Sequence, residues 1–532
     1  MRSSRTLSIL LALSFFGGVL GYQLAIKRPT EAVEKSGKPA PAGETVSVTQ
    51  SAPSGPVAGK DGAVPELDYP PGAIPGELTV QLNSREDYEA LLQALANAGL
   101  SPLGRIDQLW AVRLPQSALG KINLGRYDLR PGYAYRIVQP PPPERIAPEA
   151  LASLRAFGAS ARVITKGPLS GDGRGIRVAV LDSGVLAHPQ FDDVDVVHLD
   201  LADGGQTGPG STHGTSVASI IAGREGIAPR ADLISVRVLD GEGAGNSFQV
   251  AEGIIQAVDQ GAQVINMSLG VYEDASVLRQ AVRYAHDQGV IMVAAAGNDG
   301  FDRMSFPAAY SEVLAVTAVD ASGRQALFPN QSRAINFAAP GVGILAAGED
   351  EGTLLFSGTS AAAPFVTGSL ASLLSGENPP TPDAAVKLLS SYLNEQGAAG
   401  VDPLYGAGVL DWDRLRERSI ADLLDVALAD IYIPGDVLPG TMAQVEVTVQ
   451  NRGTKWVSGA ELAVLVGDDE PVQFTLGSLG PGQSTTRKVA APIPSRESDA
   501  ELNLAARVKS KNDRDDIRLE NNLKAATFRP SF

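Results

Sequence analysis

Cysteine is absent from this chain of 532 residues. Its absence excludes disulfide bonds, thiol catalysis, zinc sites built on cysteine and a lipid attached to an N-terminal cysteine. Basic residues are also in the minority, with 44 Lys and Arg against 60 Asp and Glu and a formal net charge of −16. Because proteins bind nucleic acid through basic patches that contact phosphates, we expect no nucleic-acid partner.

Histidine is scarce, and it occurs only at His188, His198, His213 and His286. Any reaction that uses an imidazole as a base must use one of these four residues. Aromatic residues make up only 5% of the chain, but hydrophobic residues reach 44%, which is enough for a sizeable core. The length predicts two to four domains.

Residues 1–26 have the pattern of an export signal or an N-terminal anchor. Two arginines precede the apolar stretch 6–26, which is long for a signal peptide and short for a membrane span. Cleavage after Gly21 and retention of residues 6–26 as a membrane anchor are both open alternatives. In either case we expect an exported protein with an extracellular, cell-surface or periplasmic location. Residues 27–72 are rich in Pro, Gly, Ala, Ser and Glu, which predicts a disordered linker.

Residues 73–144 are expected to form a small α+β domain. Alternating apolar residues in 76–84 predict a strand, an apolar face over 85–100 predicts a helix, and 103–114 has the pattern of another strand. The domain ends at the proline cluster QPPPPE.

Residues 145–418 are expected to form an α/β domain. Short apolar runs alternate there with amphipathic helical segments, and the runs are 177–181, 233–239, 264–269, 290–296 and 313–319. Buried strands separated by helices predict a doubly wound, mostly parallel sheet. The active sites of such sheets lie beyond the carboxyl ends of the strands. Residues 419–532 then change to a period of two, which predicts an antiparallel β-sandwich.

Ser360 lies among unusually small residues in GTSAAAPFVTG. Close backbone packing and access of a bulky substrate to the Ser360 hydroxyl would each explain them, and the stretch alone does not decide between the two. A serine hydroxyl is a poor nucleophile and needs a base within hydrogen-bond distance, oriented by a third group. His213 begins HGTSVASIIAG and is expected to start a helix over the end of the sheet. Asp182 directly follows an apolar strand and is the candidate for the orienting carboxylate. The other three histidines have the settings of structural or surface residues.

A fourth residue completes the candidate site. Asn298 follows another apolar strand in AAAGNDG, where its side-chain amide could donate to an oxyanion together with the backbone N–H of Ser360. If Ser360 starts a helix, the positive end of the helix dipole favours the same negative charge.

The four stretches VAVLDSGV, HGTSVASIIAG, AAAGNDG and GTSAAAPFVTG together resemble the subtilisin-like serine proteases, the subtilase family or peptidase S8. The resemblance covers residues 175–416 and implies peptide-bond hydrolysis through an acyl-enzyme intermediate. It implies that Asp182 is the orienting acid, His213 the general base, Ser360 the nucleophile and Asn298 the oxyanion donor. No cofactor is implied for the chemistry.

The resemblance also assigns substrate-binding residues and a role to the flanking domains. Ser268, Leu269 and Gly270 resemble the segment that pairs with an extended substrate, and Ala295, Ala296 and Gly297 resemble one wall of the pocket before the scissile bond. Residues 73–144 resemble a propeptide that inhibits the enzyme, with a permanent accessory domain as the alternative. Residues 422–526 resemble a CARDB-like β-sandwich, which implies stability, substrate docking or surface attachment.

Some expectations stay open. The family often binds structural Ca²⁺, to which Asp299 and Asp302 could contribute, although solvated loop acids are the alternative. Ala361 and Phe365 replace the Met and His that are common in the family's serine motif, and neither position performs the chemistry.

A catalytically silent binding or scaffold protein of the same fold is the main functional alternative. An esterase is disfavoured because the GxSxG elbow is missing.

Overall fold

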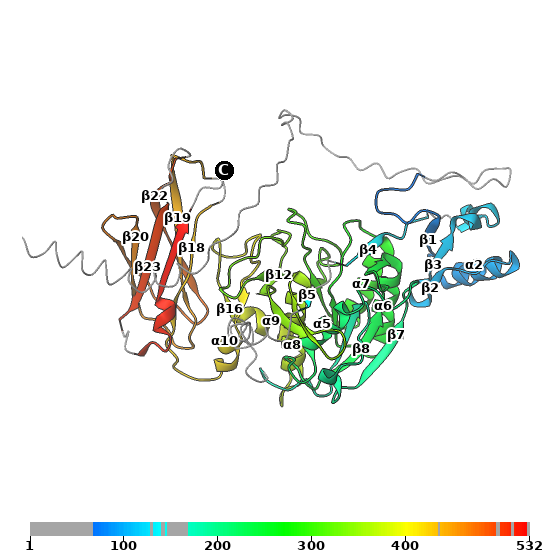
Figure 1. Cartoon of the computed structure of the whole chain (residues 1–532), viewed down its shortest axis with the longest axis horizontal. Coiled ribbons are helices and arrows are strands. Elements are labelled where there is room, and N and C mark those ends of the chain that lie inside the picture. The colour runs from blue at the N-terminus through cyan, green and yellow to red at the C-terminus, as the bar shows by residue number, and fades with distance from the viewer. Residues whose placement is uncertain are drawn as a thin grey trace, which may run out of the picture. The chain divides into compact units, whose positions relative to one another are not determined.

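A computed structural model of the chain describes residues 68–127, 131–139, 144–145, 169–434, 437–495, 501–511 and 515–528 (Figure 1). The expected export signal and nearly all of the expected linker lie outside these residues. Among the helices that the structure describes, none combines the length and the apolar character that a membrane span requires.

The N-terminal α+β unit contains a three-stranded antiparallel sheet in the order β1-β3-β2 and one helix. Its elements are β1 (Glu77–Gln81), α2 (Arg85–Asn97), β2 (Gly104–Ile106) and β3 (Ala111–Pro115). The single strand expected over 103–114 is wrong, because a 3₁₀ turn at Asp107–Leu109 divides it. The chain reverses there so that β2 can pair with β3, and Trp110 takes a left-handed conformation with φ 49°.

The central domain is built on a nine-stranded sheet. Every neighbouring pair is parallel except the pair of short strands at one edge, β16 and β17. In sheet order the strands are β16 (Leu393–Asn394), β17 (Val409–Leu410), β13 (Phe337–Pro340), β12 (Val313–Val319), β11 (Ile291–Ala295), β10 (Val264–Met267), β6 (Arg177–Asp182), β8 (Asp232–Arg237) and β7 (Val196–Asp200). The predicted α/β fold class is therefore confirmed.

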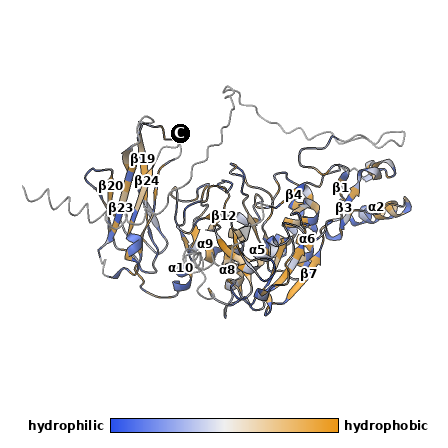
Figure 2. Cartoon of the chain, in the orientation of Figure 1, coloured by the Kyte–Doolittle hydropathy of each residue, from blue (hydrophilic) through white to orange (hydrophobic). Residues whose placement is uncertain are grey.

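Helices cover both faces of this sheet, as parallel strands that are apolar on both sides require. Successive residues of a strand point to opposite faces. Val178 and Val180 of β6 join the core with residues of α5 (His213–Ile221), α8 (Thr359–Leu374) and α9 (Pro382–Ser391). Ala179 and Leu181 join the core with α6 (Ser247–Asp259) and α7 (Ser276–Asp287). Hydrophobic residues accordingly follow the central strands and the helices beside them (Figure 2).

Helix α8 is buried along its whole length, from Thr359 to Leu374. A helix that is apolar on all sides is stable only inside a core. Its first turn, which carries Ser360, is therefore fixed by packing on every side.

The C-terminal domain contains two antiparallel sheets, in the orders β18-β19-β22 and β21-β20-β23-β24, consistent with the predicted β-sandwich. The strands are β18 (Val426–Tyr432), β19 (Met442–Asn451), β20 (Ala460–Val466), β21 (Val472–Leu476), β22 (Ser484–Pro492), β23 (Leu502–Ser510) and β24 (Leu523–Phe528). Alternate residues such as Val445, Val447 and Val449 are buried in the core that the two sheets share.

Candidate active site

Asp182 and His213 form a buried hydrogen-bonded pair. Asp182 is the last residue of β6, and His213 is the first residue of α5. The end of this strand and the start of this helix therefore meet at the carboxyl edge of the sheet. The Nδ1 atom of His213 lies 2.9 Å and 3.0 Å from the two carboxylate oxygens, and neither side chain is exposed. The backbone N–H of Ser183 also donates to Asp182, at 2.7 Å. A buried carboxylate is stable only with such partners.

The His213 ring also makes an aromatic contact. The ring of Phe356 packs edge-on against the imidazole with centroids 5.1 Å apart and an interplanar angle of 88°. Phe356 ends strand β15 (Thr353–Phe356), four residues before Ser360. Among the described residues, the buried Nε2 atom of His213 has no hydrogen-bond partner. The imidazole is thus oriented by Asp182 and Phe356, and its second nitrogen is available to accept a proton.

Ser360 lies in the first turn of α8 and is 1% exposed. Its hydroxyl donates to the carbonyl oxygen of Ser268 at 3.2 Å, so in this structure it does not hydrogen-bond to His213. Catalytic hydrogen bonds are often not formed in the absence of substrate, and a change of χ1 redirects a serine hydroxyl. The structure joins Asp182 to His213 and Ser268 to Ser360, but it does not join the two pairs by a hydrogen bond.

The segment before Ser360 also fixes Asn298. The backbone N–H and the hydroxyl of Thr359 both donate to Oδ1 of Asn298, each at 2.9 Å. Nδ2 of Asn298 therefore faces Gly358, where a Cβ atom would lie 3.3 Å from this nitrogen and 3.6 Å from the backbone N of Ser360. Gly358 has φ 139°, which favours glycine. Two N–H donors thus flank a space that Gly358 leaves open, an arrangement that suits an oxyanion.

The residues expected to bind substrate lie close to these groups. Ser268, Leu269, Ala295 and Ala296 are buried, and Gly297 adopts φ 107°. Gly270 forms an antiparallel bridge with Val138, a residue of the N-terminal unit.

The bridge to Gly270 belongs to a strand that lies between two segments of the central domain. Strand β4 (Arg136–Val138) pairs antiparallel with β9 (Ala244–Asn246) on its other side. Ile137 is fully buried. The backbone N–H of Gln139 donates to the carbonyl of Gly243 at 2.9 Å. Residues 136–139 are therefore held as an extended segment by backbone hydrogen bonds, which is how an added strand binds.

Asp299, one of the two acids suggested as Ca²⁺ ligands, is hydrogen-bonded in this structure. Its carboxylate accepts the hydroxyl of Tyr272. Within the described part of the chain, no three His, Asp or Glu side chains are grouped so as to hold a metal ion. Calcium also binds backbone carbonyl oxygens, so the contribution of Asp299 and Asp302 stays a prediction.

Several residues of the site were not identified from the sequence. Thr359 orients Asn298 and Phe356 orients His213. Both residues lie within the four positions before Ser360, and this proximity to the nucleophile in the chain was the available signal. Asn266 donates to the Ser268 hydroxyl at 3.0 Å and accepts from the Thr367 hydroxyl at 2.8 Å. Asn266 is a polar residue within the apolar strand 264–267, and this was the sequence signal that could have revealed the buried network.

Two protein-family models match this chain, and several known proteins are similar to it. A model described as the subtilase family matches residues 173–408, and a second, CARDB, matches residues 422–526. The thermostable alkaline protease of Halalkalibacterium halodurans is 36% identical over 245 residues, which cover 45% of this chain and 66% of that protein. Subtilisin Savinase of Lederbergia lenta is 34% identical over 252 residues, which cover 45% of this chain and 90% of that protein.

Among solved structures, the prenylagaramide maturation protease PagA is 32% identical, with a TM-score of 0.41, and the match covers 50% of this chain and 97% of that one. The chain spans slightly less than two thirds of the alkaline protease but most of subtilisin Savinase. With this coverage and identity, the chain belongs to the subtilase family of serine proteases.

Proposed function

We propose that the chain is a serine endopeptidase in which Asp182, His213 and Ser360 act as a catalytic triad. The observation that carries the proposal is the buried Asp182–His213 pair. Among the described residues the Nε2 atom of its imidazole has no hydrogen-bond partner, and the ring packs against Phe356 in the segment that leads to Ser360. A histidine oriented in this way is suited to accept the proton of a nearby hydroxyl.

The proposed reaction follows from these positions. The hydroxyl oxygen of Ser360 attacks the scissile carbonyl carbon while Nε2 of His213 takes the hydroxyl proton, and Asp182 stabilises the imidazolium. Asn298 Nδ2 and the Ser360 N–H donate to the oxyanion. His213 then returns its proton to the leaving amine as the C–N bond breaks. Water, deprotonated by His213, hydrolyses the acyl-enzyme and regenerates Ser360.

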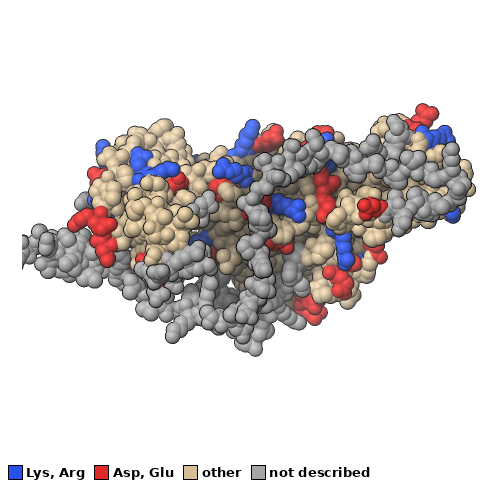
Figure 3. Space-filling model, turned by 90° about the horizontal axis from the view of Figure 1, so that it is seen from above, with Lys and Arg blue, Asp and Glu red and all other residues tan. Residues whose placement is uncertain are grey.

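We further propose that the N-terminal unit inhibits the enzyme before maturation. Strand β4 supports this, because it pairs with Gly270 in the segment that would otherwise bind the backbone of a peptide substrate. An exported zymogen with an extracellular, cell-surface or periplasmic location is consistent with the N-terminal sequence and with the family. On the face shown in Figure 3, described basic side chains are scattered among acidic ones, which gives no support for a nucleic-acid partner. Polypeptides are the proposed substrates.

The triad is tested with a chromogenic peptide and a fluorophosphonate probe that labels an activated serine. We expect labelling of Ser360 in protein freed of residues 1–144, because the N-terminal unit is proposed to inhibit the unprocessed chain. Ser360→Ala and His213→Ala should each lower kcat by about 10⁶-fold, the loss that subtilisin itself shows. His198→Ala, on the exposed part of β7, should leave kcat unchanged. A folded wild-type protein freed of residues 1–144 that neither cleaves peptide nor takes the label would favour the catalytically silent scaffold.

A structural calcium ion also stays a proposal, without assigned ligands. Its test is a comparison of thermal unfolding with added Ca²⁺ and with a chelator. A rise in the midpoint with Ca²⁺ would support binding to the folded state, and equal midpoints would contradict it.

A further inference from the structure

Asn330 is a fully buried asparagine that hydrogen-bonds to the loop carrying Asn298. It is 0% exposed and belongs to a segment that pairs with residues 296–301. Its Nδ2 donates to the carbonyl of Ala296 at 3.1 Å. Its Oδ1 accepts from the backbone N–H of Asp299 at 3.1 Å and of Phe301 at 3.0 Å. These contacts lie on both sides of Asn298 along the chain.

The backbone of the same segment strengthens this attachment. The backbone N–H of Asn330 donates to the carbonyl of Gly297 at 3.0 Å, and that of Gln331 donates to the carbonyl of Phe301 at 2.8 Å. A Cβ atom on Gly297 would lie 2.2 Å from Nδ2 of Asn330. Gly297 thus leaves the space that the Asn330 amide fills, and the two segments are in direct contact.

The fourth hydrogen bond of the Asn330 amide goes to Tyr272. Nδ2 of Asn330 donates to the Tyr272 hydroxyl at 2.8 Å, and that hydroxyl donates to the Asp299 carboxylate. Burial, reinforced by the hydrogen bond to Asp299, raises the pKa of Tyr272 to about 12, so the hydroxyl keeps its proton at neutral pH. The guanidinium of Arg303 lies 4.7 Å from the centroid of the Tyr272 ring.

Only an asparagine amide of this length makes all four side-chain hydrogen bonds. The amide offers two N–H donors and an oxygen with two lone pairs, and each of the four is used here. Aspartate at this position would place an oxygen against the Ala296 carbonyl, and alanine would leave buried backbone groups without partners. The hydrogen-bonding groups of the Asn330 side chain are therefore complementary to those of the 296–301 loop.

We propose that Asn330 is a positioning residue for the oxyanion donor, acting through the 296–301 loop to hold the Asn298 amide beside Gly358. This inference rests on the proposed peptidase function. Thr359 fixes the rotation of the Asn298 amide, whereas Asn330 fixes the backbone on both sides of it. Neither Asn330 nor Tyr272 touches the reacting atoms.

The expected size of the effect follows from the cost of losing the donor itself. In subtilisin, removal of the oxyanion-hole asparagine lowers kcat by about 10²–10³-fold. A displaced donor keeps part of its interaction, so Asn330→Ala should lower kcat by about 10–100-fold. KM should change less than kcat, because the segment expected to pair with the substrate backbone, 268–270, lies outside the loop, although Ala296 and Gly297 of the expected pocket wall lie within it.

The test is a double-mutant cycle in chains expressed in full and then freed of the inhibitory N-terminal unit, with kcat and KM measured on one peptide substrate for wild type, Asn330→Ala, Asn298→Ala and the double variant. If Asn330 acts through Asn298, Asn330→Ala should lower kcat in the wild-type background and have almost no further effect in the Asn298→Ala background. Asn336→Ala is the matched control. Asn336 lies six residues further on, and its side chain accepts from the backbone N–H of Ala315, which lies outside the loop. This variant should leave kcat unchanged.

Two results would overturn the inference. One is an equal loss of kcat from Asn330→Ala in both backgrounds, which is what a merely structural role produces. The other is a folded Asn330→Ala enzyme with wild-type kcat. If Asn330→Ala does not fold, Tyr272→Phe is the second variant, because it removes one hydrogen bond to Asn330. It should lower kcat by about 2–5-fold, and the same double-mutant cycle with Asn298→Ala tests whether this loss depends on Asn298. Absence of activity in the wild type would instead contradict the proposed function.

Discussion

Ser268 and Ser360 hydrogen-bond to each other's backbone in both directions. The Ser268 hydroxyl donates to the Ser360 carbonyl at 3.0 Å, and the Ser360 hydroxyl donates to the Ser268 carbonyl at 3.2 Å. Pro364 lies four residues after Ser360 within α8 and has no N–H, so the Ser360 carbonyl lacks its usual helical donor. The Ser268 hydroxyl supplies the missing hydrogen bond. The end of β10 and the first turn of α8 are thereby held together.

Ser268→Ala should leave the buried Ser360 carbonyl without this donor. We expect the free energy of unfolding to fall by about 1–3 kcal/mol, with a lower kcat, because the first turn of α8 loses an attachment. Denaturant unfolding and peptide hydrolysis measure the two effects. Adding Pro364→Ala to Ser268→Ala restores a helical N–H and should recover part of the lost stability. No recovery in the double variant would contradict the proposed role of the proline.

Ile137→Arg should weaken the inhibition by β4. The Ile137 side chain is fully buried, and burial of such a side chain contributes about 1.5–3 kcal/mol. We expect faster fluorophosphonate labelling of Ser360 in the unprocessed full chain, with processing followed by gel electrophoresis. Val138→Arg is the matched control, since the neighbouring Val138 is 58% exposed and should have little effect. Equal labelling rates in wild type and Ile137→Arg would contradict inhibition by this strand.

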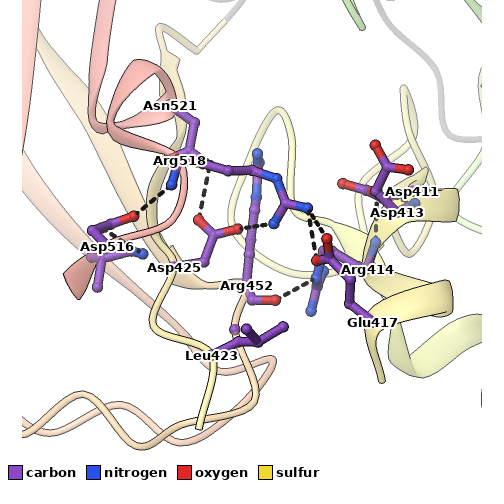
Figure 4. A network of polar contacts seen from close by, with 12 residues as sticks. Asp411, Asp413, Arg414, Glu417, Leu423, Asp425, Arg452, Asp516, Arg518 and Asn521 are labelled. Carbon is purple, nitrogen blue, oxygen red and sulfur yellow. Dashed lines mark hydrogen bonds and ion pairs between the residues drawn. The ribbon is translucent and has the colours of Figure 1, made fainter. Parts of the chain in front are cut away.

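Arg518 links the β-sandwich to α10 (Trp412–Glu417) of the central domain (Figure 4). Its guanidinium donates to both carboxylate oxygens of Glu417, at 2.6 Å and 2.7 Å, and to Asp425 at 2.8 Å. Burial opposes the charge of Arg518, but the bonds to these two acids outweigh it and raise the pKa of the guanidinium. Asp425 is itself 1% exposed and also accepts a hydrogen bond from Nδ2 of Asn521 at 2.8 Å.

Arg518→Ala should therefore destabilise the full chain by about 3–5 kcal/mol, since it leaves the Asp425 carboxylate buried with reduced compensation. Thermal unfolding measures the loss. Arg487→Ala is the control, because the side-chain hydrogen bonds described for Arg487 stay within its own strand, at Thr485 and Thr486. If both variants unfold at the same temperature, the Arg518 cluster does not stabilise the two domains.

Glu395 should make stability depend on pH. Burial, together with the nearby Asp402, raises the pKa of its carboxyl from the ordinary 4.5 to about 7, while the Gly400 N–H that donates to it acts in the opposite direction. The folded chain thus holds this proton more tightly than the unfolded chain. By linkage, the contribution of Glu395 to stability falls as pH rises from about 4.5 to about 7, and it stays low at higher pH.

Glu395→Gln removes the titration and should flatten this part of the profile. Thermal midpoints at pH 5 and pH 8 are compared for both proteins, and the drop between them should be smaller in the variant. An identical drop would show that Glu395 does not carry the dependence.

The strands of the central sheet were largely predictable because a strand buried on both faces is apolar at every position. The run 313–319 coincides with β12, and 177–181 differs from β6 by one residue. Strand β7 was missed because it is a sheet edge whose side chains are mostly exposed or half-buried, so it lacks the apolar run. The run 264–269 was predicted two residues too long, because Ser268 and Leu269 leave the sheet at the site.

The α/β class and the residue types of the candidate site could be predicted from local patterns, since Asp182, His213, Asn298 and Ser360 each occur in a short motif. Three-dimensional packing was needed to show how Ser268 completes the hydrogen bonding of Ser360, how Asn330 holds the loop of Asn298, and how Arg136–Val138 lies against Gly270. Periodicity and motifs are properties of neighbouring residues. These contacts join residues that are far apart in the chain, and packing of the whole core brings them together.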